Sequence, residues 1–148
     1  MHNLYTPKKA IRNPAYQYEE KRKIKTHNKI HVEQTKKNIA SVERLTKLSN
    51  PLMELLTKYF ESGEKINEKT QKLILVRLKV IANATKRQLD LEKIFIKENK
   101  ISVRSKSSSL RIHGIRRNLN NLLIYTNYLE SYNQLPEGFT KQFKYAYL

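Results

Sequence analysis

Two histidines and a large set of basic side chains are the residues whose types and spacing could do chemistry. His27 and His31 are four positions apart, so on a helix they share one face, as the zinc ligands of His-Glu-x-x-His enzymes do. Asn28 stands where those enzymes carry their general base, and Lys25 and Lys29 would repel a bound cation. We therefore expect no metal site at this pair.

Other catalytic patterns are missing from the sequence. The chain has no Cys, three Gly and a single aspartate, Asp90. It therefore lacks a thiol nucleophile and a glycine-rich loop for nucleotide phosphates. A carboxylate site for magnesium would have to be built from glutamates, and none cluster in the sequence. The sequence predicts that the protein is not an enzyme and needs no cofactor.

Positive charge is the strongest feature of the sequence. The 148 residues contain 30 Lys and Arg against 13 Asp and Glu, a formal net charge of +17 at pH 7. Such an excess repels itself unless an acidic partner supplies counter-charge. Each cation that neutralises a phosphate also releases condensed counterions, which favours binding. We expect the partner to be a nucleic acid, with DNA and RNA both open.

Three clusters of side chains could contact such a partner. The first lies in the N-terminal segment, and the second lies between residues 104 and 118, where no acidic residue occurs. The third lies at the C-terminal end, where Phe143, Tyr145 and Tyr147 could stack on bases. The candidate nucleic-acid contacts are Lys8, Lys9, Arg12, Lys21, Arg22, Lys23, Lys25, Arg104, Lys106, Arg111, Arg116, Arg117, Asn118, Lys141 and Lys144.

The hydrophobic pattern predicts that helices position these clusters. Three Gly and four Pro in the whole chain disfavour a turn-rich β fold. The segment 68–98 contains no Gly or Pro and would form a helix about 45 Å long. Its apolar residues form two neighbouring stripes at helical spacing. The first stripe is Leu73, Val76 and Val80, and the second is Ile74, Leu78 and Ile81.

We expect an all-α fold, a bundle of three to four helices with the long central helix at 68–98. A basic N-terminal arm at 1–37 precedes the bundle at 38–135, and a short aromatic tail at 136–148 follows it. Pro51 is expected to end one helix and to start a short second one, because proline cannot donate a backbone hydrogen bond.

A second interpretation concerns the C-terminal half. Residues 91–148 resemble a winged helix-turn-helix, with the turn at Gly114 and residues 139–147 as the wing. Arg116, Arg117 and Asn118 would then start the recognition helix, and Arg and Asn can contact guanine and adenine edges. The resemblance implies a DNA-binding regulator.

The favoured function is a non-enzymatic structural or accessory protein of a nucleoprotein assembly, with other protein subunits or further copies of the chain as partners. A second alternative is a helical adaptor that binds acidic proteins or an anionic membrane surface. No apolar run approaches the roughly 20 residues of a membrane-spanning helix. The compartment is open, with an intracellular location or a nucleoprotein particle favoured over secretion.

Overall fold

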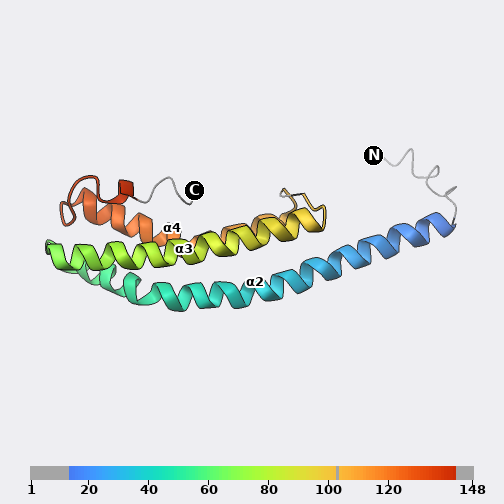
Figure 1. Ribbon diagram of the computed structural model, residues 1–148, viewed down its shortest axis with the longest axis horizontal. Helices are drawn as coiled ribbons and strands as arrows, with labels where there is room; N and C mark the ends of the chain where they lie inside the picture. Colours follow the sequence, from blue (N-terminus) through green and yellow to red (C-terminus); the bar gives the residue numbers. More distant parts are fainter. Residues whose placement is uncertain (1–13, 103, 143–148) are drawn as a thin grey trace, which may run out of the picture. The chain divides into compact units, whose positions relative to one another are not determined.

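The computed structural model describes the backbone of residues 14–102 and 104–142 and the side chains of residues 28–102 and 104–142. It contains three long helices, α2 (Pro14–Ser62), α3 (Glu68–Glu98) and α4 (Lys106–Ser131), and a single 3-10 turn, η1 (Thr140–Gln142) (Figure 1). No strand occurs among these residues, so the predicted all-α bundle is confirmed.

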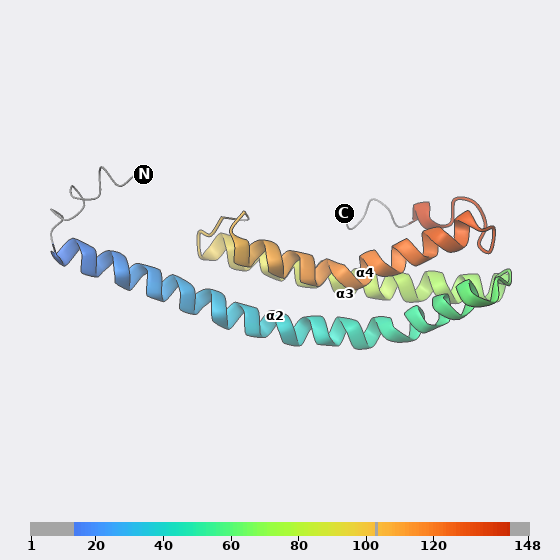
Figure 2. The same cartoon turned by 180° about the vertical axis from the view of Figure 1, so that it is seen from behind.

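The chain divides into two compact units, residues 1–36 and 37–148. The second unit holds the bundle, in which α3 and α4 lie side by side and antiparallel (Figure 2). In the described residues, no helix combines the length and the apolarity needed to span a membrane.

Capping side chains define both ends of the helical hairpin. The central helix has the predicted bounds, because the side chain of Asn67 accepts a hydrogen bond from the Thr70 backbone N–H at 2.8 Å and starts it there. The side chain of Ser105 accepts from the Ser108 N–H at 3.3 Å and starts α4. Between the end of α3 and the start of α4, a short connection that includes Lys100 at φ 51° reverses the direction of the chain.

The hydrophobic core is built from one stripe of each helix. Leu56 of α2, Ile74 and Leu78 of α3 and Leu122 of α4 are completely buried. Leu135 and Phe139, which follow α4, cover the same end of the core. Of the two apolar stripes in α3, only the second faces this core.

The expected helix end at Pro51 is wrong, because α2 continues through it to Ser62. Pro51 itself is exposed, while Leu45 and Leu52 on either side of it are buried in the bundle. Packing on both sides of the proline therefore outweighs the backbone hydrogen bond that it removes. In Figure 1 the ribbon of α2 changes direction where its colour passes from cyan to green.

The expected turn at Gly114 is also wrong, because α4 runs without interruption from Lys106 to Ser131. Gly114 is buried and faces α2, where a Cβ atom on it would lie 3.8 Å from Val42 Cγ2 and 3.9 Å from Asn38 Oδ1. The described residues therefore contain no helix-turn-helix. The expected wing falls largely on residues 143–148, outside the described residues.

Candidate nucleic-acid interface

The sequence-predicted contacts of the bundle have different surroundings in the structure. Arg104, Lys106, Arg117 and Lys141 are exposed. Arg116 is half-buried, and its Nε donor has no hydrogen-bond partner. The remaining candidates, apart from Arg111 and Asn118, lie outside the described residues or side chains: Lys8, Lys9, Arg12, Lys21, Arg22, Lys23, Lys25 and Lys144.

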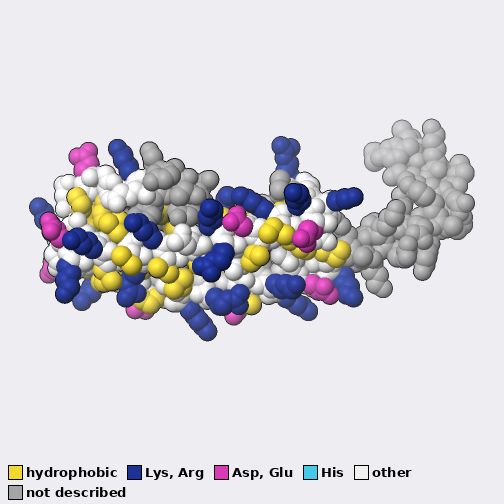
Figure 3. All heavy atoms as spheres, viewed as in Figure 1, with side chains coloured by type: hydrophobic (Ala, Val, Ile, Leu, Met, Phe, Trp, Pro, Cys, Tyr) yellow, Lys and Arg dark blue, Asp and Glu magenta, His cyan; other side chains and the backbone are white. Residues whose placement is uncertain are grey.

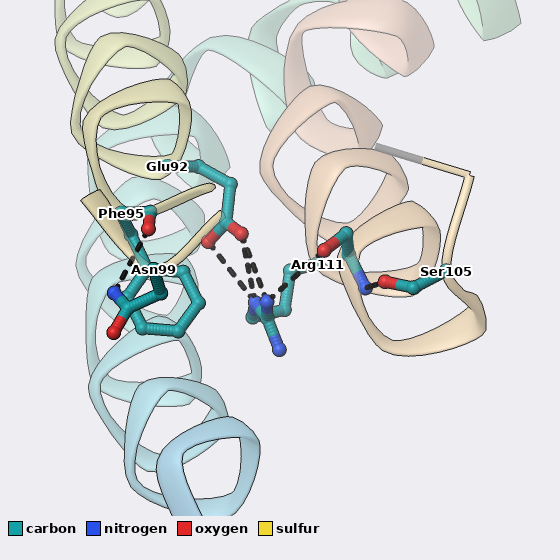
Figure 4. Close-up of polar contacts among 6 residues, drawn as sticks. Glu92, Phe95, Asn99, Ser105 and Arg111 are labelled. Carbon is teal, nitrogen blue, oxygen red and sulfur yellow. Dashed lines mark hydrogen bonds and ion pairs between the residues drawn. The ribbon is translucent and has the colours of Figure 1, made fainter. Parts of the chain in front are cut away.

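Asn118 and Arg111 hold the bundle together. The side-chain amide of Asn118 donates a hydrogen bond to Thr46 Oγ1 at 3.0 Å and so ties α4 to α2. Arg111 is only 2% exposed, and its Nε donates to both carboxylate oxygens of Glu92 at 3.0 Å. Figure 4 shows the guanidinium pointing at this carboxylate beside the Phe95 ring. Arg111 is therefore not a surface cation, and we leave it out of the interface.

A row of lysines along α3 is the feature that the sequence interpretation missed. Lys72, Lys79, Lys86 and Lys93 recur every seven residues, and all four are exposed. Seven residues make about two helical turns, so neighbours in this row are about 10.5 Å apart on one side of the helix. We call these four residues the lysine column. Its fixed seven-residue spacing is a signal that could have been read from the sequence.

The lysine column lies on the side of α3 away from α2. Ala84 and Gln88 border a shallow groove against Leu45 and Leu48 of α2. Lys86 is two positions from Ala84 and two from Gln88, and two positions correspond to about 200° around the helix. The column is therefore turned away from this groove.

Arg116 lies on the corresponding side of α4. It is two positions, again about 200°, from both Gly114 and Asn118, which face α2. The Arg111–Glu92 pair fixes how α4 lies against the antiparallel α3. Arg116 lies five residues after Arg111, about 7.5 Å along α4, and Lys86 lies six residues before Glu92, about 9 Å along the antiparallel α3. Arg116 and Lys86 are therefore at about the same level. The lysine column and Arg116 thus share one face, which we call the α3–α4 face.

The surplus of positive charge is uneven along the bundle. Residues 73–129 contain twelve Lys and Arg against three Asp and Glu, a net charge of +9. Around the α2–α3 connection, residues 52–72 contain four of each, a net charge of zero. Figure 3 shows Lys and Arg side chains all along one face, with fewer Asp and Glu side chains and with hydrophobic ones between them. The electrostatic attraction for a polyanion is therefore centred on α3 and α4.

Helix α4 carries one acidic residue, Glu130, near its C-terminal end. Its carboxylate accepts hydrogen bonds from the backbone N–H of Thr140 at 2.8 Å and of Gly138 at 3.2 Å. These donors, the Thr140 N–H above all, and the nearby Lys141 lower the pKa of Glu130 below 4.5, against the opposing effect of desolvation. The carboxylate is thus engaged by the turn that follows the helix.

Among the residues with described side chains, no three His, Asp or Glu side chains are grouped so that they could hold a metal ion. Comparison of the chain with protein-family models, with curated proteins and with solved structures finds no match.

Proposed function

We propose that the protein binds the phosphate backbone of a nucleic acid through its α3–α4 face, as a non-enzymatic structural or accessory part of a nucleoprotein assembly. The single observation that carries this proposal is the lysine column, four exposed cations in register on one helix, with Arg116 beside it. Three acids of α3 are exposed: Glu68, four residues before Lys72, and Asp90, four residues after Lys86, lie on the same side of the helix as the column, and Glu98 lies at its C-terminal end. The lysines still outnumber these acids on that side. A surface of this kind attracts a polyanion rather than a small ligand.

The spacing of the column fits an extended partner. Four lysines about 10.5 Å apart span about 32 Å, far more than one anion of a metabolite could fill. A lysine ammonium is a point charge on a flexible stem and makes no bidentate contact with a base edge. The proposed binding is therefore largely independent of base sequence and strongly dependent on salt.

The alternative of a DNA-binding regulator needs a turn before the residues that would read bases. Since α4 is continuous through Gly114 and Asn118 is bonded to α2, we do not propose this function.

A comparison of two matched triple variants tests the proposal. Lys79, Lys86 and Lys93 are replaced by Gln in one variant. In the other, Lys47, Lys58 and Lys65, which lie on α2 and on the α2–α3 connection, are replaced by Gln. Both variants lose three positive charges from exposed positions. Affinity for fluorescently labelled oligonucleotides, measured by anisotropy, should fall about tenfold or more in the first variant and little in the second.

Two outcomes would contradict the proposal. An equal loss in both variants would show that total charge, not the α3–α4 face, governs binding. No binding of any oligonucleotide by the unaltered protein at about 50 mM salt, where phosphate contacts are strongest, would exclude nucleic acid as the partner. Binding to acidic proteins or anionic vesicles alone would then favour the adaptor function.

A further inference from the structure

Four aromatic rings, three exposed and one, Tyr125, half-buried against the core, form a cluster where the C-terminal ends of α2 and α4 meet. Measured between ring centroids, Phe60 of α2 lies 6.3 Å from both Tyr125 and Tyr128 of α4 and 5.9 Å from Tyr132, the residue that follows α4. Tyr125 and Tyr128 are 6.5 Å apart. Three of the four contacts are edge-to-face, and the fourth, between Phe60 and Tyr128, is tilted at 42°. We call these four residues the aromatic cluster.

The exposure of the aromatic cluster distinguishes it from core packing. Tyr132 is 66% exposed, Tyr128 51% and Phe60 41%, whereas the neighbouring core residues Leu56 and Leu129 are completely buried. Tyr128 and Tyr132 therefore keep half or more of their surface in contact with water. Large apolar groups gathered at one exposed place mark a binding surface more often than a structural one.

The aromatic cluster lies on the α2 side of α4, and Arg117, the neighbour of Arg116 in the chain, lies on the same side of the helix as Tyr128. Arg117, Ile124 and Tyr128 follow at spacings of seven and four residues, so they lie on one side of the helix. Tyr128 lies eleven positions after Arg117, about 16.5 Å along the helix axis. No acidic residue occurs in α4 before Glu130, whose carboxylate is engaged by Gly138 and Thr140. Between Arg117 and the rings, α4 therefore presents no negative charge, and the exposed acid nearest to the rings in sequence is Glu61 of α2, next to Phe60.

Resting on the proposed function, we infer that the nucleic acid is single-stranded and that its unpaired bases stack on the aromatic cluster. Every base has a π face, so tyrosine and phenylalanine rings hold bases without reading their sequence. The bases of a duplex are already stacked on one another and cannot use the rings.

The test compares a single strand with the duplex of the same sequence on the full chain. With both Tyr128 and Tyr132 changed to Leu, affinity for the single strand should fall at least about fivefold for each stacked base lost, while affinity for the duplex stays unchanged. Changing both to Phe should preserve single-strand binding, because the ring and not the hydroxyl does the stacking. Leu110→Ala, at a 62% exposed apolar position of the same helix, is the matched control.

A second readout comes from the tyrosines themselves. The chain has no Trp, so its intrinsic fluorescence comes from its nine Tyr residues. Quenching on addition of a single strand should decrease in the Leu double variant and persist in Leu110→Ala.

The failures of the two proposals can be told apart. If the Leu double variant binds single strand and duplex as the unaltered protein does, the stacking inference is overturned. The proposed function survives that result when the Lys79, Lys86 and Lys93 variant still weakens binding. The stacking inference is also overturned if the Leu double variant loses a protein partner while its oligonucleotide affinity is unchanged. If the unaltered protein binds no oligonucleotide, both the stacking inference and the proposed function are overturned.

Discussion

The guanidinium of Arg111 in α4 pairs with the carboxylate of Glu92 in α3 inside the bundle, where each side chain is only 2% exposed. Nε and Nη2 of Arg111 both lie 3.0 Å from Glu92 Oε2, and Nε also lies 3.0 Å from Oε1. The guanidinium carbon lies 5.1 Å from the centre of the Phe95 ring. This pair joins the two antiparallel helices at one level and thereby sets which residues of α3 and α4 share the α3–α4 face.

Removing one member of this pair should destabilise the bundle strongly. Arg111→Met leaves the buried Glu92 carboxylate without the counter-charge that Arg111 supplies, so the free energy of unfolding should fall by about 3–5 kcal/mol. Adding Glu92→Leu should recover most of the loss, because two apolar side chains can pack where the ions were. Urea denaturation followed by circular dichroism measures both. A double variant no more stable than the single one would show that the charges themselves are not the cause.

Substitution of Gly114 tests whether α4 is a continuous helix or contains a turn at this position. Gly114→Ala places a Cβ at ordinary contact distance from Val42 and Asn38, and alanine is the better helix former. We expect the free energy of unfolding to rise by about 0.5–1 kcal/mol. The same substitution at a turn that requires positive φ would destabilise the protein. Thermal unfolding decides between the two, and a lower melting temperature would contradict the continuous α4.

Acid should weaken the contact between α4 and the turn that follows it. The pKa of Glu130 in the fold lies below its unfolded value of 4.5, so its stabilising effect is present above that value. The effect is lost as the pH falls through the folded pKa. Glu130→Gln retains one of the two acceptor oxygens but no charge, and should cost about 1 kcal/mol near pH 7. The difference between the two proteins should shrink as the pH falls below about 4.5. A difference independent of pH would exclude the carboxylate charge as its source.

The salt dependence of binding should report the lysine column directly. Replacing Lys79, Lys86 and Lys93 by Gln removes up to three phosphate contacts. The slope of log affinity against log salt concentration should then become less negative by about 2 for a single strand and about 3 for a duplex. Titrations between about 50 and 200 mM salt give the slope. An unchanged slope in this variant would mean that these lysines do not touch phosphates.

The sequence by itself determined the fold class and the bounds of the central helix. The apolar period along 68–98, the absence of Gly and Pro there and the capping residue Asn67 are local properties, so helical geometry follows from them directly. The net charge of +17, and with it the expectation of an acidic partner, is also a property of the sequence alone.

Only the tertiary structure decided which local signals count. It buried Ile74 and left the equally apolar Leu73 exposed, and it carried α2 through Pro51, because packing against the other helices outweighs local preference. It also turned Arg111 from a surface cation into a buried partner of Glu92, nineteen residues away in the chain. The sequence specifies the charge of a side chain. Whether that side chain is exposed to solvent or paired with an opposite charge depends on which helix packs beside it.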